Sequence, residues 1–257
     1  MSDDYLRFEG VTKQFGPVPV VAPTDLSIGR GEFVAFLGPS GCGKTTLMRM
    51  VGGLDTPTSG RILLEARPVG GPDRRRGMVF QSYSSFPWQT VAENIAFGMR
   101  YRDDMSPQEK TASVAHHLAL IGLEAFADHY PNRISGGMRQ RVAIARTLAA
   151  GSEVLLMDEP FGALDALTRE RLQVELRRIQ AHEAKTTIFV THDVEEAVFL
   201  ADRIVVFSQR PARVVAQVDV TAVLGVERSL DLRESRPFFD LRNDVLHLIR
   251  HETGDPQ

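Results

Sequence analysis

The chain has 257 residues, 43% of them hydrophobic and 25% charged, and it is long enough to bury a sizeable core as one large domain or two small ones. Its formal net charge of −3 excludes the global basic excess typical of nucleic-acid-binding proteins, and its single cysteine, Cys42, excludes an intramolecular disulfide and fits a reducing compartment. The acidic N-terminus does not resemble a signal peptide and no run of about 18 apolar residues predicts a membrane span, so any membrane association must come through a partner.

The predicted elements begin with residues 4–30, where short strands and turns predict an antiparallel arrangement. Five continuous apolar runs follow, and they predict strands buried on both faces of a parallel sheet. Segments with helical spacing alternate with these runs, so the pattern predicts an α/β layered fold. The predicted strands are 33–37, 77–80, 154–157, 187–190 and 204–207, and the predicted helices are 44–52, 106–120, 137–150, 166–183 and 193–201.

Residues 88–148 contain helical patterns and no convincing strand, which predicts a helical subdomain inserted into the α/β core. One helix start within it is marked by Ser106 as the cap and Pro107 in the first turn. The tail continues with an extended piece from about 211 and a helix around 236–250. The expected divisions are 1–87 (β subdomain and first part of the core), 88–148 (helical subdomain), 149–220 (second part of the core) and 221–257 (helical tail).

The strongest local motif is "GPSGCGKTT", from Gly38 to Thr46. It fits G-x-x-x-x-G-K-[ST] and lies between a predicted strand and a predicted helix, which separates it from a glycine-rich turn that matches by chance. Glycines let the backbone wrap closely around phosphates, and the helix N-terminus then points its N–H groups at the anion. Lys44 can reach the β- and γ-phosphates, and the Thr45 hydroxyl can ligate Mg²⁺.

A second motif, "VLLMDEP", ends an apolar strand in two consecutive carboxylates. We expect Asp158 to hold Mg²⁺, directly or through water, and Glu159 to face the attacking water as general base. An acidic turn after a strand is common by itself. Beside a phosphate loop, the two carboxylates favour hydrolysis over a plain turn.

Two more polar residues follow predicted strands: Gln81 follows "GMVF" and His192 follows "TIFVT". Ligands of parallel sheets bind beyond the carboxyl ends of the strands, so both residues can converge with the phosphate loop and the two carboxylates. Gln81 is then expected at Mg²⁺ or the attacking water, and His192 at the γ-phosphate. The convergence predicts a nucleotide hydrolase, and the other histidines are interpreted as solvated or structural.

The stretch "ISGGMRQR" (134–141) places a serine and two glycines at a predicted helix start, although glycine costs roughly 1 kcal/mol in a helix. Ser135 can cap this helix, while Gly136 and Gly137 expose N–H groups as a second phosphate-binding terminus. One γ-phosphate hardly needs two such termini from the same chain.

Together these motifs resemble the nucleotide-binding subunits of ATP-binding cassette (ABC) transporters over about residues 5–215. The resemblance implies a P-loop NTPase (RecA-like) core with a mainly parallel sheet, an N-terminal antiparallel β subdomain and an inserted α-helical subdomain. "GPSGCGKTT" is similar to the Walker A loop, "VLLMDEP" to Walker B, "ISGGMRQR" to the signature LSGGQ and "FGALD" to the D-loop with Asp165. Gln81 is similar to the Q-loop glutamine and His192 to the switch histidine. Phe15 matches the aromatic residue that stacks on adenine, with an ordinary apolar contact as the alternative.

The resemblance implies two copies packed head to tail, with each ATP, and its Mg²⁺, between the Walker A loop of one copy and the signature of the other. The implied nucleotide-binding residues are Phe15, Gly38, Pro39, Ser40, Gly41, Cys42, Gly43, Lys44, Thr45 and Thr46, the implied signature contacts are Ser135, Gly136, Gly137 and Gln140, and the implied metal ligands are Thr45, Gln81 and Asp158. A reactive thiol is also expected at Cys42, because a helix N-terminus lowers the pKa of a thiol.

A closer resemblance is to the nitrate, sulfonate and taurine importer branch, carried by "DEPFGALDALTRERLQ" and "THDVEEAVFLADRIVVFSQRPARV". It implies transmembrane permease subunits, indirectly a solute-binding protein, and a peripheral position on the cytoplasmic face of the cell membrane. Met138 replaces the signature glutamine, and "SSFPW" replaces a more leucine-rich stretch where the permease would dock.

Two alternatives to a transport ATPase stay open. One is a soluble ABC ATPase acting on nucleic acid or ribosomes, but such proteins usually carry two cassettes or a coiled-coil insert, and "DRRRG" (73–77) is expected to be a solvated loop rather than a nucleic-acid patch. The other is a nucleotide-binding module without turnover, against which the presence of Glu159 and His192 argues.

Overall fold

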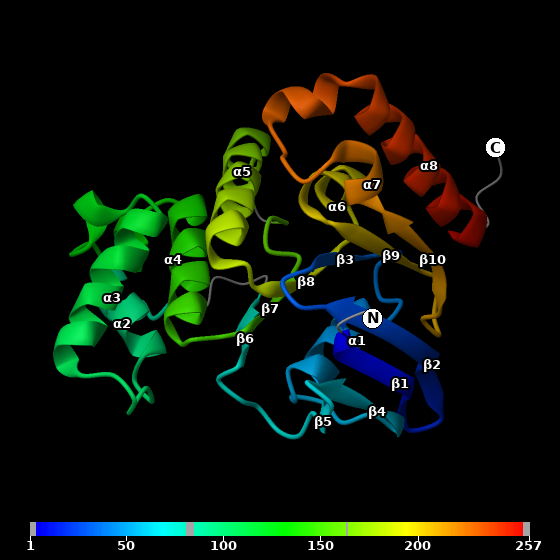
Figure 1. Cartoon of the computed structure of the whole chain (residues 1–257), viewed down its shortest axis with the longest axis horizontal. Coiled ribbons are helices and arrows are strands. Elements are labelled where there is room, and N and C mark those ends of the chain that lie inside the picture. Colours follow the sequence, from blue (N-terminus) through cyan, green and yellow to red (C-terminus); the bar gives the residue numbers. More distant parts are fainter. Residues whose placement is uncertain (1–3, 81–84, 163, 254–257) are drawn as a thin grey trace. The chain divides into compact units, whose positions relative to one another are not determined.

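The computed structural model describes residues 4–80, 85–162 and 164–253 and divides the chain into two compact units (Figure 1). Unit 1 consists of Met1–Asp73 and Ala184–Gln257, and unit 2 consists of Arg74–Glu183. No helix in the described part of the chain is long and apolar enough to cross a membrane.

Unit 1 contains an antiparallel sheet with the strand order β2-β1-β4-β5 (Figure 1). Its strands are β1 (Asp4–Phe15), β2 (Val18–Gly29), β4 (Ser59–Leu64) and β5 (Arg67–Pro68). The antiparallel arrangement expected from residues 4–30 is confirmed, but β1 and β2 are two strands of 12 residues each rather than several short ones. The hairpin between them closes where Phe15 pairs with Val18.

The second sheet of unit 1 has the order β10-β9-β3-β8, in which β3 pairs in parallel with both β8 and β9. The strands are β3 (Phe33–Leu37), β8 (Thr186–Thr191), β9 (Arg203–Phe207) and the antiparallel edge strand β10 (Val214–Asp219). β3 and β8 are buried at every position, as their continuous apolar sequences predict. The helices of unit 1 are α1 (Lys44–Val51), α6 (Val194–Leu200), α7 (Val220–Leu224), η3 (Leu230–Glu234) and α8 (Arg236–Thr253).

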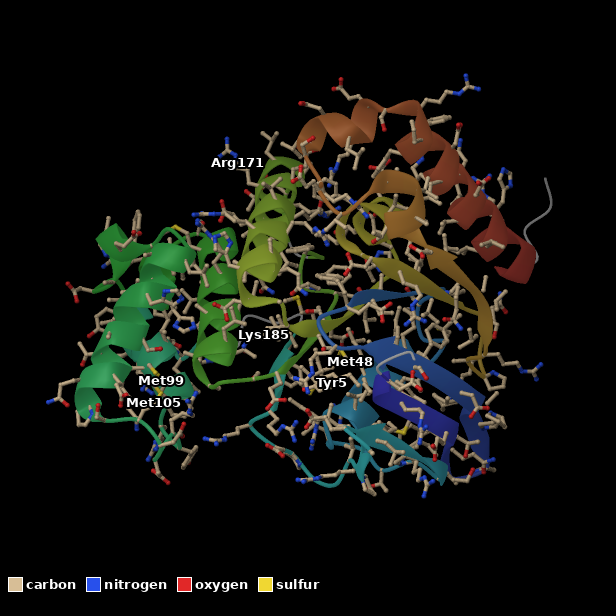
Figure 2. All side chains as sticks on the ribbon, in the orientation of Figure 1. Tyr5, Met48, Met99, Met105, Arg171 and Lys185 are labelled. Carbon is tan, nitrogen blue, oxygen red and sulfur yellow. The ribbon has the colours of Figure 1, made fainter. Side chains whose placement is uncertain are left out.

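Aromatic side chains join the two sheets of unit 1 into one core. The ring of Phe36 in β3 lies 6.5 Å from that of Phe8 in β1 and 5.0 Å from that of Phe207 in β9, measured between centroids. All three side chains are at most 1% exposed, and burying a phenylalanine contributes roughly 1.5–3 kcal/mol. Met48 of α1, labelled in Figure 2, is fully buried in the same unit. The core therefore anchors β3, and with it the loop that follows.

Unit 2 combines a parallel strand pair with a group of helices. β6 (Arg76–Val79) pairs with β7 (Val154–Asp158), so that Val79 lies opposite Met157. The helices are α2 (Val91–Gly98), α3 (Pro107–Leu120), η1 (Glu124–Phe126), η2 (Pro131–Arg133), α4 (Gly136–Ala149) and α5 (Ala166–Glu183). α2 packs on α3 and α4, and Met99, which directly follows α2, is fully buried (Figure 2).

The predicted cap of α3 is confirmed as a complete capping box. The Ser106 hydroxyl accepts a hydrogen bond from the Glu109 N–H at 3.3 Å, and the Glu109 carboxylate accepts one from the Ser106 N–H at 2.7 Å. These bonds lower the pKa of Glu109, the backbone N–H of Ser106 contributing most.

The expected solvated loop at residues 73–77 is wrong in its second half. Arg75 makes a bidentate ion pair with Glu153, at 2.9 and 2.8 Å, and Arg76 is 9% exposed at the start of β6. Only Arg74 remains exposed, and it pairs with Asp104 at 2.9 Å. Arg74 and Arg75 are thus paired with carboxylates of unit 2 and Arg76 is buried, which argues further against a nucleic-acid patch.

Candidate functional site

The phosphate loop of unit 1 runs from the end of β3 to the start of α1 and depends on glycine for space. A Cβ on Gly38 would lie 2.6 Å from the Phe207 carbonyl oxygen, and one on Gly43 would lie 2.8 Å from that of Val20. Gly43, with φ of 130°, precedes α1 without a side-chain capping bond. Gly43 thus places no side chain over the start of α1, as suits a phosphate site at a helix N-terminus. Along this loop, Pro39 and Thr46 are half-buried, and Ser40, Gly41 and Thr45 are exposed.

Lys44 is folded against its own loop. Its side chain is buried, and Nζ donates hydrogen bonds of 2.7 Å to the carbonyl oxygens of Gly38 and Pro39. The Cys42 Sγ lies 3.7 Å from the same Nζ, and Cys42 is 2% exposed. An alkylating reagent needs access to the sulfur, so this burial makes Cys42 a poor target, contrary to the expectation of a reactive thiol.

His192 follows β8 where that strand ends beside the phosphate loop. Leu37 pairs with Thr191, so Gly38 and His192 are the next residues of two neighbouring parallel strands. The segment is fixed by Asp193, whose carboxylate caps α6 by accepting bonds of 2.8 and 3.1 Å from its first N–H groups. His192 is exposed, and two of the four predicted strand-end groups are therefore brought together within unit 1.

Phe15 lies at the end of β1 with its ring 50% exposed. The Lys13 Nζ lies 4.9 Å from the centroid of this ring. An aromatic side chain held at a hairpin tip and half open to solvent is suited to stack on a flat ligand, and it is not part of the buried core.

The two carboxylates of "VLLMDEP" lie at the end of β7 in unit 2. Asp158 is the last residue of the strand and is half-buried, as is Glu159. Glu159 has φ of 42°, in the left-handed region. A residue with a side chain pays roughly 1–2 kcal/mol there, and such strain is concentrated at functional sites. The left-handed backbone is thus a second feature of Glu159 besides its charge, and Glu65, Ala66 and Ala184 share it.

Asp165 immediately precedes α5 in the same unit and is exposed. Its carboxylate accepts a 3.0 Å hydrogen bond from the Thr168 N–H, and this bond is the main reason that the pKa of Asp165 is lowered. Asp165, which the resemblance assigns to the D-loop, therefore also caps α5.

Ser135 caps α4, as predicted, by accepting a 3.3 Å hydrogen bond from the Met138 N–H. A hydroxyl has one donor besides its lone pairs, so the cap leaves the Ser135 O–H able to donate. Ser135 is exposed and Gly136 half-buried at the helix terminus, where the first N–H groups have no partner inside the helix.

Gly137 has a packing role that sequence reasoning missed. A Cβ on it would lie 2.7 Å from the Thr168 Cγ2 and 3.3 Å from the Leu172 Cδ1, so glycine lets α4 approach α5. Gln140 is fully buried, and neither polar atom of its side chain has a hydrogen-bond partner among the described residues. A contact of Gln140 with a nucleotide on another chain would first require its exposure.

Asn94 of α2 is a structural residue that sequence analysis did not select. Gln81 and the three residues after it lie outside the described part of the chain. Beyond them, the fully buried Asn94 accepts a 2.8 Å bond from the Phe86 N–H and donates to the carbonyl oxygens of Phe86, Gln89 and Thr90 at 2.9–3.1 Å. This network presents Trp88, 71% exposed, on the surface of unit 2. An asparagine near a helix start has no sequence signal that separates such a role from ordinary surface polarity.

Comparison with known proteins identifies relatives for almost the whole chain. The sequence profile described as ABC transporter matches residues 21–162. An uncharacterized ABC transporter ATP-binding protein of Methanocaldococcus jannaschii is 45% identical over 96% of this chain and 92% of its own length. A nitrate import ATP-binding protein of Synechococcus elongatus, NrtD, is 44% identical over 95% of this chain and 91% of its own length.

Solved structures agree in fold. The structure of cbiO1 from Clostridium perfringens, part of the ABC transporter complex cbiONQ, has a TM-score of 0.78 at 28% identity and covers 86% of this chain and 91% of its own. The dimeric structure of an ATP-binding cassette in a post-hydrolysis state, bound to ADP and Pi, has a TM-score of 0.71 at 33% identity and covers 84% and 98%. The predicted α/β fold with a P-loop NTPase core is confirmed.

Proposed function

The chain belongs to the ABC transporter family and is an ATPase, and from this premise we propose that it is the energy-coupling subunit of an importer for a small anion. Two copies close head to tail around ATP, hydrolysis opens them, and the motion passes to permease subunits at the cytoplasmic face of the membrane. The observation that carries the proposal is that two helices of one chain, α1 and α4, begin at glycine-containing segments suited to bind an anion.

The terminus at α1 binds the phosphates of the chain's own ATP. Lys44 leaves the carbonyl oxygens of Gly38 and Pro39 and moves to the β- and γ-phosphates, exchanging neutral acceptors for charged ones. His192, one residue beyond the strand pair that ends at the loop, contacts the γ-phosphate. Phe15 stacks on the base.

The terminus at α4 binds the γ-phosphate held by the second copy. The Ser135 O–H donates to a phosphate oxygen, while the cap to Met138 keeps the hydroxyl in place. The dimeric ABC cassette that resembles this chain, with ADP and Pi bound, supports this assembly.

Hydrolysis is assigned to Glu159 as general base, with Asp158, Thr45 and Gln81 as the ligands of Mg²⁺. Hydroxyl, carboxylate and amide oxygens suit this ion, which usually takes one or two protein carboxylates beside the phosphates and water. Bound Mg²⁺ would supply charge neutralisation.

The solute is proposed to be nitrate, taurine or an aliphatic sulfonate, with another small organic solute of the same branch as an alternative. Nitrate import ATP-binding proteins of Synechococcus elongatus and Synechocystis sp. are 43–44% identical to this chain. A bicarbonate transport ATP-binding protein is 42% identical, although this chain spans only 34% of that protein's length. These names favour a small anion and do not separate one from another. We place permease docking at the segment of Trp88, which is 71% exposed, because the resemblance to the importer branch puts the permease contact there. A soluble ABC ATPase without transport remains the alternative class.

The test is the hydrolysis rate of Glu159→Gln. Removing a general base should slow ATP hydrolysis by roughly 10²–10⁴ while ATP still binds. The matched control is Glu153→Gln, which changes a carboxylate of the same unit that pairs with Arg75. Unchanged turnover in Glu159→Gln would remove the residue from its assigned role. Co-purification with a multi-span membrane protein separates the transport ATPase from the soluble alternative.

A further inference from the structure

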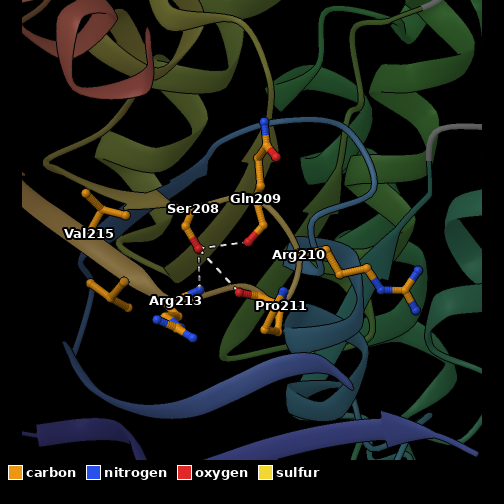
Figure 3. Close-up of a pocket in the computed structure, with 7 residues that line it drawn as sticks. Ser208, Gln209, Arg210, Pro211, Arg213 and Val215 are labelled. Atoms are coloured by element: carbon orange, nitrogen blue, oxygen red, sulfur yellow. Dashed lines mark hydrogen bonds between the residues drawn. The ribbon is translucent and has the colours of Figure 1, made fainter. Parts of the chain in front are cut away.

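The loop between β9 and β10 lines an open pocket of about 520 Å³ in unit 1 (Figure 3). Ser208 organises this loop, because its Oγ lies 2.8 Å from the Gln209 carbonyl oxygen and 3.3 Å from that of Pro211 and accepts a 3.1 Å bond from the Arg213 N–H. The pocket is lined by Ser208, Gln209, Arg210, Pro211, Arg213, Val214 and Val215.

This loop lies against the phosphate loop. The Ala212 N–H donates to the Val20 carbonyl oxygen at 2.9 Å, and the Ala22 N–H donates to the Ala212 carbonyl oxygen at 3.0 Å, so the loop is bonded to β2 on both sides of Val21. The Ala212 Cβ is 3.1 Å from the position that a Cβ on Gly43 would take. The last glycine of the phosphate loop therefore has Ala212 as its neighbour.

Two residues before Ala212, Arg210 reaches the hairpin that carries Phe15. Its Nε lies 3.4 Å from the carbonyl oxygen of Pro19. Pro19 pairs with Gln14, and the next pair along the hairpin is Phe15 with Val18, about 3.3 Å farther along the strand. Arg210 thus lies two residues from Ala212, which contacts the phosphate loop, and bonds to the hairpin one residue pair away from Phe15.

Most N–H donors of the Arg210 guanidinium have no partner among the described residues. It is exposed, and within the described residues it makes no ion pair and only its Nε has a hydrogen-bond partner. Arg213, from the same loop, points to the opposite side (Figure 3). The two arginines therefore do not form one anion clamp, and only Arg210 is directed by a bond to the hairpin.

We propose that Arg210 is a nucleotide-binding residue that donates hydrogen bonds to the nucleoside part of ATP. This inference rests on the proposed function, in which the phosphates lie at Lys44 and the base at Phe15. The nucleoside then lies along the hairpin, where Arg210 is fixed. A guanidinium donates only, and ribose oxygens and the ring nitrogens of the base are acceptors that fit it.

The test compares two ligands, ATP and inorganic tripolyphosphate, by calorimetric titration of the full chain in about 0.15 M salt, where charges are screened beyond about 8 Å. Arg210→Gln should weaken ATP binding by about 3-fold to 30-fold, the loss of one or two hydrogen bonds, and should change tripolyphosphate binding less than about 2-fold. Glutamine can still donate to the Pro19 carbonyl, so the loop keeps its tether. Arg213→Gln is the matched control and should leave both affinities unchanged.

Three results would overturn the inference: no effect of Arg210→Gln on ATP, an equal effect on both ligands, or the same effect from Arg213→Gln. An equal effect on both ligands would assign Arg210 to the phosphates through its charge alone. Failure of the proposed function has a separate signature, in which the unaltered chain binds neither ligand or Lys44→Ala leaves binding of both intact.

Discussion

The same substitution at two glycines of the phosphate loop should have very different costs. Gly43 has φ of 130°, and an added Cβ would approach the Val20 carbonyl oxygen to 2.8 Å and the Ala212 Cβ to 3.1 Å. Gly41 has φ of 73°, and nothing lies within 4 Å of an added Cβ. Gly41→Ala therefore introduces backbone strain alone, whereas Gly43→Ala adds a collision with a strand that cannot move without breaking its sheet.

The expected losses of stability follow from backbone strain and from the collision of the added Cβ. Left-handed strain at Gly41→Ala costs about 1–2 kcal/mol. At Gly43→Ala a forbidden backbone costs about 1–3 kcal/mol and overpacking adds about 1–3 kcal/mol, for a sum of roughly 2–6 kcal/mol. We expect Gly43→Ala to lower the free energy of unfolding by at least about 1 kcal/mol more than Gly41→Ala does.

The assay is urea unfolding without nucleotide, followed by circular dichroism. Trp88, the only tryptophan in the sequence, belongs to unit 2, so its fluorescence would not report directly on the phosphate loop. Equal losses of stability in the two variants would refute the reasoning, because they would mean that the space around Gly43 does not limit its side chain.

Other outcomes follow from unit 2. Asn94→Ala should lower the free energy of unfolding by roughly 2–4 kcal/mol in urea, since it removes both N–H donors and the acceptor of a buried side-chain amide that joins Phe86, Gln89 and Thr90. A loss below about 0.5 kcal/mol would contradict the network. Ser106→Ala should cost about 1 kcal/mol in the same assay, because it breaks the capping box of α3, and a neutral outcome would deny the cap its role. NMR titration should give Glu109 a pKa below the ordinary glutamate value of about 4.3. Its contribution to stability is then present above that pH and is lost as the pH falls through the lowered pKa. A pKa at or above about 4.3 would be inconsistent with the bonds to Ser106.

Sequence patterns predicted the core of the fold because its signals are local and long. The run 33–37 coincides with β3, and the predicted helix 166–183 coincides with α5. α7 was missed since five residues are too few to display a helical period. β4 was missed because its apolar run, Ile62 to Leu64, has only three residues, and β5 has only two residues in all.

Site residues were predictable from the sequence where their role depends only on local geometry, such as the start of a helix. Ser135 as a cap followed from its position before a helix. The packing role of Gly137 could not be predicted in this way, because its closest neighbours, Thr168 and Leu172, are more than 30 positions away in the sequence and belong to a different helix. The burial of Cys42 and the position of Arg210 depend in the same way on tertiary contacts that no short motif encodes.

The central claim is that each ATP site is shared between two copies, and mixing two inactive variants tests it most directly. Lys44→Ala removes the phosphate-binding amine. Ser135→Asp keeps a good helix cap but places a carboxylate where the γ-phosphate should bind, and Ser135→Asn is the neutral control that also caps well. In a mixed head-to-tail dimer, one site combines the intact Lys44 of one copy with the intact Ser135 of the other.

The expected result is that Lys44→Ala and Ser135→Asp each hydrolyse ATP poorly alone and regain activity when mixed. About half of the chains pair as mixed dimers at equal concentrations, and each mixed dimer holds one intact site of two, so recovery should approach about one quarter of the normal rate if sites act independently. A mixture no more active than its components would contradict the shared site and return Ser135 to the nucleotide of its own chain.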